Sequence, residues 1–329
     1  ESEKAVRLGL EWLKNHQQED GRWGLHKSKE QPKFDGYGSV KSDTAATGLA
    51  LLPFLGAGHT HVSGDYQDTV TRGVDWLVAN QKENGDLYTG GGGNSHMYSH
   101  GIAAIALCEA YGVSQDRKYK EAAQRAIDFI IEAQHKGSGG WRYKPGQSAD
   151  TSVVGWQLMA LKSAEMAGLN VPKEPLSLVT KWFDKCEGNG KERGTYGYQG
   201  RGGTPAMTAE GLLCRQFLGM SRDDDSMRNG AKYLLDHLPK KGKGKDTSYY
   251  WYYATQVMYH MQGDYWEQWN ASTRDMLVKT QPKNGDNAGT WDPKDQWEKS
   301  GGRIFSTSLR LLMLEVYYRH LPLYRQLED

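Results

Sequence analysis

Two kinds of helix alternate along the whole sequence, and this alternation constrains the fold more than any other feature. Residues 3–16 carry Val6, Leu10 and Leu13 on one face, which is the spacing of an amphipathic helix. Residues 44–55 are apolar around most of the circumference, so that helix has little room for a solvated face. The amphipathic pattern returns at 67–80, 118–133, 176–186, 226–238 and 265–280, and the apolar pattern at 100–110, 151–164, 208–218, 249–261 and 306–318. The sequence therefore predicts twelve helices in six pairs.

The expected starts of the apolar helices are regularly spaced, near residues 43, 99, 150, 207, 247 and 306. Gaps of roughly 40 to 60 residues are typical of helical repeat arrays. A helix amphipathic on one side, paired with a helix buried on all sides, suits two concentric layers. We therefore predict an all-α fold, a single (α/α)6 toroid domain over residues 1–329, with parallel inner helices whose N-termini share one mouth. An open solenoid is less favoured because the terminal repeats are no more polar than the middle ones.

A short motif follows several of the outer helices. It reads Gln17-x-x-x-Gly21-x-Trp23 and returns as Gln81-x-x-x-Gly85-x-Leu87, with looser copies at 134–141 and 281–291. The motif resembles the glutamine-tryptophan repeat of squalene and other triterpene cyclases, whose superfamily includes the β-subunits of protein prenyltransferases. We expect the glutamine to bond neighbouring backbone and the tryptophan to pack between hairpins. The resemblance covers nearly the whole chain and implies the toroid fold, but no particular reaction.

The stretch from Gly90 to Ala110 combines a glycine run, two histidines and an apolar helix. If Ser99 caps this helix, His100 stands at its electropositive N-terminus, which suits an anion. Ser99-His100-Gly101 is similar to the diphosphate-binding histidine segment of the prenyltransferases, and Arg201 to their diphosphate-binding arginine. The neighbouring lysine and tyrosine of that family fall on Thr204 and Glu210, where this sequence departs from the pattern.

Residues 147–154 resemble the Asp-x-Asp-Asp element of class II terpene cyclases, whose middle aspartate donates a proton. Ala149 replaces that acid, and only Asp150 remains. Asp43-Thr44 and Asp246-Thr247 repeat the Asp-Thr pair at other inner-helix starts, so the pattern favours N-caps worth about 1 kcal/mol each. The resemblance nevertheless leaves Asp150 and His100 as the candidate catalytic residues.

The zinc ligands of protein prenyltransferases are all replaced. Their aspartate, cysteine and histidine fall on Met207, Ala209 and Ser306. His59 and His61 lack a third ligand in the sequence, and a turn is the favoured interpretation. We therefore predict no bound zinc and no other cofactor.

The remaining candidates are substrate-binding residues near the inner-helix starts. We predict a mouth lined by His96, Tyr98, His100, Asp150, Arg201, Tyr250 and Arg303. Trp251 joins them from the aromatic run Tyr249-Tyr250-Trp251-Tyr252-Tyr253. Helix N-termini, Arg201 and His100 should attract a diphosphate or carboxylate there. We expect inorganic diphosphate to bind weakly and an isoprenyl diphosphate, which adds a hydrocarbon tail, to bind more tightly. The basic segment from Lys240 to Lys245 is interpreted as a solvated loop.

Composition limits the function classes. With 41 basic and 40 acidic residues, the net charge of +1 gives no reason to expect a nucleic acid partner. No apolar run approaches the roughly 20 residues that span a bilayer, and no segment of signal-peptide type is present. Because the sequence begins at Glu1 rather than Met, the location in the cell stays open. Cys108, Cys186 and Cys214 are expected to be buried thiols.

Three functions remain open. The first is an isoprenoid-handling protein, terpene cyclase-like or prenyltransferase-like, with a small or lipid-like ligand in a central cavity. The second is a carbohydrate-active (α/α)6 enzyme such as a polysaccharide lyase. The third is a non-catalytic recognition toroid. A deep apolar pocket favours the first, a shallow polar groove the second and a filled centre the third.

Overall fold

The computed structural model describes residues 1–30, 32–90, 92–239 and 248–317. This part of the chain contains twelve α-helices and one short 3-10 helix, η1 (Gly190–Glu192). The helices are α1 (Ser2–Asn15), α2 (Asp43–Gly56), α3 (Gln67–Ala79), α4 (His96–Ser114), α5 (Arg117–Glu132), α6 (Thr151–Met166), α7 (Lys173–Cys186), α8 (Pro205–Phe217), α9 (Asp225–Leu235), α10 (Ser248–Met261), α11 (Gly263–Thr280) and α12 (Gln296–Leu314). The predicted twelve helices in six pairs are confirmed.

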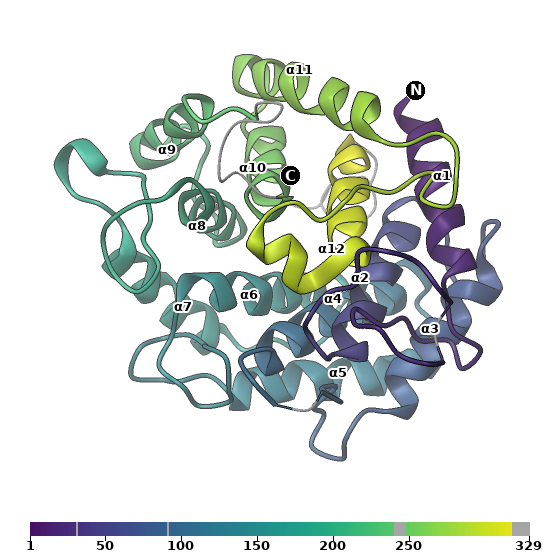
Figure 1. Cartoon of the computed structure of the whole chain (residues 1–329). Coiled ribbons are helices and arrows are strands. Elements are labelled where there is room, and N and C mark those ends of the chain that lie inside the picture. Colours follow the sequence, from purple (N-terminus) through teal and green to yellow (C-terminus); the bar gives the residue numbers. More distant parts are fainter. Residues whose placement is uncertain (31, 91, 240–247, 318–329) are drawn as a thin grey trace.

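The helices form a closed double ring (Figure 1). The even-numbered helices make the inner layer, in which each packs against the next, and α2 contacts α12 to close the circle. The odd-numbered helices lie outside them, and α1 contacts both α11 and α12. The chain is therefore an (α/α)6 toroid, as the helix alternation predicts.

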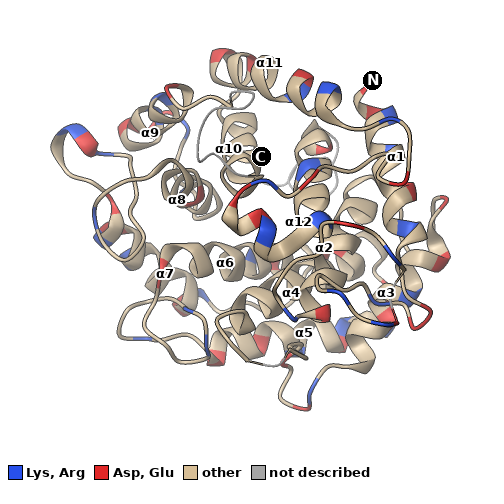
Figure 2. Cartoon of the chain, in the orientation of Figure 1, with Lys and Arg blue, Asp and Glu red and all other residues tan. Residues whose placement is uncertain are grey.

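Side-chain chemistry explains the two layers. Every residue of α2 except Asp43 is buried, whereas α5 buries only one face, with Ala123, Ile127 and Ile130 among its buried residues. Charged residues are correspondingly concentrated on the outer helices and loops, and α2, α4 and α6 are nearly free of them (Figure 2). The hydrophobic core therefore lies around and between the inner helices.

The glutamine of each repeat motif joins one hairpin to the next. The Gln17 side-chain amide donates to the carbonyl of Gly21 at 2.8 Å and to the carbonyl of Thr69, in α3, at 2.9 Å. In the same way, Gln81 and Gln134 each donate to the carbonyl of the glycine in their own loop and to a carbonyl of the next outer helix, α5 and α7 respectively. Gln281 closes the ring, because it donates to the carbonyl of Ala5, in α1, at 2.8 Å. The motif thus acts as the staple that its sequence predicts.

The motif glycine allows the loop to touch the next outer helix. Gly85 has φ +89°, and a Cβ at this position would lie 2.1 Å from the carbonyl oxygen of Arg125. Gly146 also has a positive φ, +71°, but a Cβ there would meet nothing within 4 Å. The two glycines therefore separate the cost of the backbone conformation from the cost of the close approach.

We expect Gly85→Ala to lower the free energy of unfolding by about 2–4 kcal/mol, because the methyl group adds a clash to the strain of a positive φ. Gly146→Ala should cost about 1–2 kcal/mol, from the backbone conformation alone. Urea unfolding followed by circular dichroism measures both. Equal losses in the two variants would show that the close approach to Arg125 carries no energy.

The helix starts confirm one detail of the sequence interpretation and correct two others. Asp150 caps α6 as predicted, but the cap of α2 is Ser42 rather than Asp43, which instead lies 3.2 Å from Arg22. The start of α4 is His96 and its cap residue is Ser95, so Ser99 lies inside the helix and bonds the Ser95 carbonyl at 2.6 Å. The predictions for Asp246-Thr247 and for the loop from Lys240 to Lys245 lie outside the described residues.

Two further predictions concern the thiols and the membrane. Cys108, Cys186 and Cys214 are buried and free, as expected. Within the described ranges, no helix combines the length and apolar character needed to cross a bilayer.

Candidate functional site

Four tyrosines meet around the N-terminus of α6, at the ring face where the inner helices begin. Tyr98 on α4 places its hydroxyl 2.5 Å from Oγ of Ser152. Tyr249 on α10 donates to the Ser152 carbonyl at 3.2 Å. Tyr143 and Tyr198, from the loops before α6 and α8, place their hydroxyls 2.5 Å apart. We call these four residues, with Arg142, Asp150, Ser152 and Glu210, the α6 cluster.

Asp150 is the fully buried centre of the α6 cluster. Its Oδ1 accepts the backbone N–H of Val153 at 3.0 Å and the hydroxyl of Ser152 at 2.7 Å. Its Oδ2 accepts the Tyr198 hydroxyl at 3.0 Å and lies 3.3 Å from Nε of Arg142. Burial raises the pKa of Asp150 while these four donors oppose the rise. Since every partner can donate, the arrangement suits a carboxylate that caps α6 and orients its neighbours.

Glu210 is the second buried acid, and its surroundings differ. It is fully buried on α8, and its Oε2 lies 2.8 Å from the Tyr249 hydroxyl oxygen. No cation pairs with it among the described residues, and its Oε1 has no hydrogen-bond partner there. Burial therefore raises the pKa of Glu210 well above its usual range. A neutral carboxylic acid beside Tyr249 is the form that this environment favours.

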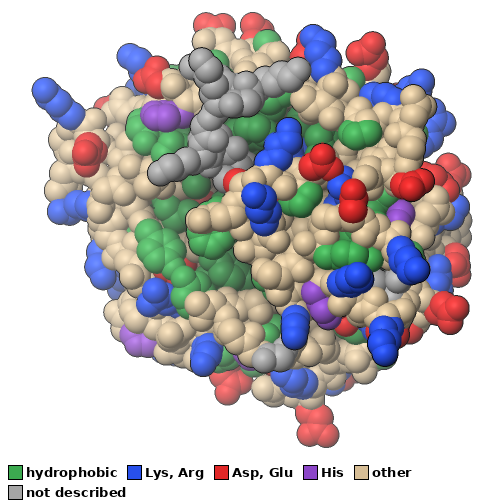
Figure 3. Space-filling view, in the orientation of Figure 1, with side chains coloured by type: hydrophobic (Ala, Val, Ile, Leu, Met, Phe, Trp, Pro, Cys, Tyr) green, Lys and Arg blue, Asp and Glu red, His purple; other side chains and the backbone are tan. Residues whose placement is uncertain are grey.

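The same face is hollowed at its middle, and hydrophobic side chains gather there (Figure 3). Partly buried apolar groups at the inner-helix ends include Tyr98, Ala206, Tyr249 and Phe305. Met207 and Trp251 are each 9% exposed beside them in sequence. The polar atoms of the α6 cluster thus lie beside an apolar surface, which is the composition of many small-molecule sites.

His100 does not line this face, because its ring is fully buried. Its Nδ1 accepts the backbone N–H of Leu87 at 3.1 Å, and its Nε2 lies 2.9 Å from the Ala126 carbonyl on α5. Threonine takes this place elsewhere in the ring, where Thr47, Thr208 and Thr307 accept the N–H groups of Trp23, Tyr196 and Trp291. His100 therefore fastens a repeat loop to the inner layer, and neither ring nitrogen is left for an anion.

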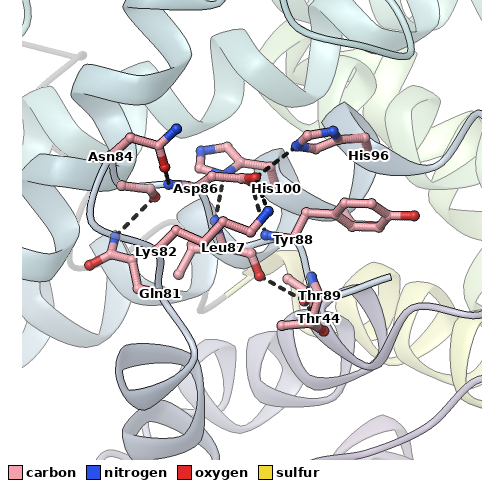
Figure 4. Close-up of polar contacts among 12 residues, drawn as sticks. Thr44, Gln81, Lys82, Asn84, Asp86, Leu87, Tyr88, Thr89, His96 and His100 are labelled. Atoms are coloured by element: carbon pink, nitrogen blue, oxygen red, sulfur yellow. Dashed lines mark hydrogen bonds and ion pairs between the residues drawn. The ribbon is translucent and has the colours of Figure 1, made fainter. Parts of the chain in front are cut away.

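His96 belongs to a cluster around the buried Asp86, on the outer side of α4 (Figure 4). The Asp86 carboxylate lies 3.0 Å from Nε2 of His96, 2.5 Å from Nζ of Lys82 and 3.5 Å from Nδ1 of His100. Although burial alone raises the pKa of Asp86, the donors of His96, Lys82 and the Tyr88 backbone hold it far below its usual range. The His96 ring stacks on Tyr88 at 4.5 Å, away from the α6 cluster.

The other predicted mouth residues have separate surroundings. Arg303 is buried and pairs with Asp35 at 2.7 Å and Asp292 at 2.6 Å, so two carboxylates offset its charge. Arg201 is exposed, and its Nε donates to the Glu187 carbonyl at 3.1 Å.

Tyr250 and Trp251 begin α10 but differ in direction. The Tyr250 hydroxyl donates to the His237 carbonyl at 3.1 Å, and its ring meets Trp269 of α11, so it faces the outer layer. Trp251 packs against the guanidinium of Arg310, 5.9 Å from its ring centre. Of the eight predicted site residues, the structure brings only Tyr98 and Asp150 into the α6 cluster. In the described part of the chain, no group of three or more His, Cys, Asp or Glu residues could hold a metal ion.

The sequence interpretation missed Arg142, Tyr143, Ser152 and Tyr198 as site residues. Arg142 and Tyr143 directly follow the motif residue Trp141, and Tyr198 comes two residues after Tyr196, which stands at the tryptophan position of its repeat. Residues just after each motif therefore reach the face where the inner helices begin. The regular spacing of the repeat motifs could therefore have pointed to these residues in the sequence.

The ring and its staples define the chain as an (α/α)6 toroid whose repeat is similar to that of the terpenoid cyclase and protein prenyltransferase superfamily. The family model of the squalene-hopene cyclase C-terminal domain matches residues 1–100. The squalene–hopene cyclase of Zymomonas mobilis is 29% identical over 129 residues, which are 38% of this chain and 19% of that cyclase. That of Bradyrhizobium diazoefficiens is 31% identical over 80 residues, 24% of this chain and 11% of the cyclase. The matched segments thus span less than a fifth of these relatives.

Solved structures share the fold over nearly the whole chain. A glycoside hydrolase family 76 mannosidase from Bacteroides thetaiotaomicron has a TM-score of 0.67 at 11% identity, covering 100% of both chains. The type II terpene cyclase MstE from Scytonema, in complex with geranylgeranyl dihydroxybenzoate, has a TM-score of 0.64 at 12% identity, covering 97% of both. At such identities the likeness shows the toroid fold alone.

Proposed function

We propose that this protein binds an isoprenoid in the hollow at the inner-helix N-terminal ends. The observation that carries the proposal is the apolar surface beside the α6 cluster, where tyrosine rings and a few polar atoms adjoin a hydrophobic hollow. Burying a branched hydrocarbon there would gain about 25 cal/mol per Å² of apolar surface. The sequence similarity to squalene–hopene cyclases supports the same ligand class.

A catalytic role does not follow from these contacts. Asp150 accepts three hydrogen bonds, one of them as the cap of α6, and pairs with Arg142, while His100 has both ring nitrogens engaged. A residue that protonates an alkene needs a proton to give and a path to the substrate. Isoprenoid binding is therefore the function proposed, with catalysis by Asp150 or His100 left as an untested expectation.

A carbohydrate-active role is the second candidate, because the family 76 mannosidase shares the complete fold and the α6 cluster offers tyrosines with two acids. Glycosidases place two carboxyl groups on either side of an accessible bond. Here Asp150 and Glu210 are both fully buried, so neither reaches a sugar on this face. This burial favours the apolar ligand.

We expect farnesol to quench tryptophan fluorescence saturably, and Ala206→Phe to weaken its binding at least tenfold by adding a large ring at the start of α8, where Ala206 is only partly buried. Val62→Phe is the matched control, since Val62 is 59% exposed and follows the C-terminal end of α2, away from this face. Melting temperatures of both variants show whether the fold is kept.

A parallel titration with mannotriose tests the carbohydrate alternative. Saturable binding of mannotriose without binding of farnesol would replace the isoprenoid proposal by the carbohydrate one. Equal loss of farnesol affinity in Ala206→Phe and Val62→Phe would contradict the location of the site.

A further inference from the structure

Arg142 is the cation that the structure places in the α6 cluster, and its orientation is fixed. Its Nε lies 3.3 Å from Oδ2 of the buried Asp150, and its guanidinium stacks over the Tyr143 ring at 4.9 Å. The guanidinium also interacts with the hydroxyls of Tyr143 and Tyr198. Arg142 pairs with the buried carboxylate and still keeps 29% of its side-chain surface accessible, so a ligand can reach it. Arg142 is thus a preorganised donor at the edge of the hollow.

The local charge is nevertheless balanced. Asp150 carries the negative charge that pairs with Arg142, and Glu210 is favoured as a neutral acid. Among the described residues, the other cations predicted at this face contribute little, because Arg303 faces two carboxylates and His100 is buried and bonded. Arg201 is exposed in the loop before α8. Within the described residues, a group with several negative charges at Arg142 would therefore also meet the Asp150 carboxylate, which already pairs with this cation.

We infer that the polar end of the ligand is a neutral oxygen, a hydroxyl or a carbonyl, which accepts a hydrogen bond from the terminal amino groups of Arg142. The inference rests on the proposed isoprenoid function and defines the ligand class within it. The Tyr143 hydroxyl lies beside the same position and supplies a second polar contact. Asp150 has two effects there: it orients Arg142, and it disfavours a diphosphate. The inference differs from the sequence expectation that the mouth attracts an anion, and ligand binding distinguishes the two.

Three ligands with one hydrocarbon skeleton test the inference, namely farnesol, farnesyl diphosphate and farnesene. The wild-type protein should bind farnesol at least tenfold more tightly than either of the other two. Arg142→Gln should remove the advantage of farnesol over farnesene, because it takes away the fixed donor. Arg222→Gln is the matched control, since Arg222 is exposed beyond the C-terminal end of α8. It should change none of the three affinities.

Arg142→Gln should cause a loss of affinity, whereas Asp150→Asn should cause a gain. Asparagine caps a helix about as well as aspartate, so α6 should keep its cap while the negative charge disappears. With Arg142 no longer neutralised, affinity for farnesyl diphosphate should rise at least tenfold. A structural role of Asp150 alone would produce no such gain.

The outcomes separate the inference from the proposed function. Wild-type binding of farnesyl diphosphate as tight as that of farnesol, or unchanged diphosphate affinity in Asp150→Asn, would overturn the inference while isoprenoid binding stands. Binding of none of the three ligands would overturn the proposed function and the inference with it.

Discussion

Arg310→Met is expected to lower the free energy of unfolding by about 3–5 kcal/mol, because it leaves a buried carboxylate without its cation. Arg310 is 5% exposed and Glu298 is 1% exposed, and the Arg310 Nη2 to Glu298 Oε1 distance is 2.7 Å. Glu298 also accepts the backbone N–H of Ser248 and that of Lys294, so it joins α12 to the start of α10. Urea unfolding of wild type and variant at pH 7 measures the loss.

Two controls make this prediction specific. Lys279→Met removes a cation from Asp275 on the exposed face of α11 and should cost less than about 1 kcal/mol. Combining Arg310→Met with Glu298→Leu should recover part of the loss, since both charges are then gone. A loss below about 1 kcal/mol in Arg310→Met would contradict a stabilising role for the pair.

Asp86→Asn should lower the free energy of unfolding by about 2–4 kcal/mol at pH 7, because it removes the buried charge that Lys82 and His96 contact. The folded-state pKa of Asp86 is far below its usual range, whereas the unfolded chain protonates near pH 4. A depressed pKa gives stability that is complete above the unfolded pKa and is lost as the pH falls toward the folded one. The difference between wild type and variant should therefore shrink below about pH 4.

Denaturant unfolding at pH 7, 5 and 3 tests this pH dependence. Asp68→Asn is the control, because Asp68 is exposed on α3 and pairs only with Arg72 across one helical turn. It should cost less than about 0.5 kcal/mol at pH 7. A gap between wild type and Asp86→Asn that stays constant from pH 7 to pH 3 would show that the charge of Asp86 is not the source of the stability.

The fold could be predicted because its determinants are local and repeated. The apolar circumference of residues 44–55 and the single apolar face of residues 3–16 are visible in sequence, and the glutamine motif recurs after several outer helices. Each of these features corresponds to a contact in the structure, such as the Gln17 bond to the Thr69 carbonyl. Periodicity and motif spacing were therefore sufficient to predict the architecture.

The candidate site was harder to predict from the sequence, because residue type alone does not show which way a side chain points. His100 resembles a ligand in sequence, yet it holds the place that threonine holds at 47, 208 and 307. Ser99 was assigned as a cap, but α4 starts earlier, so the register of His100 relative to the helix end was wrong. Arg142 and Tyr198 lie in loops, and only the path of those loops brings them to Asp150.

The bond from Gln281 to the Ala5 carbonyl has a consequence for synthesis of the chain. Because α1 and α2 find their partners α11 and α12 only after roughly 250 further residues, the hairpin of α1 and α2 emerges from the ribosome with one flank uncovered. At about 5–20 residues per second, that flank waits roughly 12–50 s for its neighbour. Ring closure should then be a late, rate-limiting event, slowed by the long loop that it must close. Before the Gln281 bond forms, the incomplete ring exposes a flank through which chains could associate, and the closed toroid covers that flank.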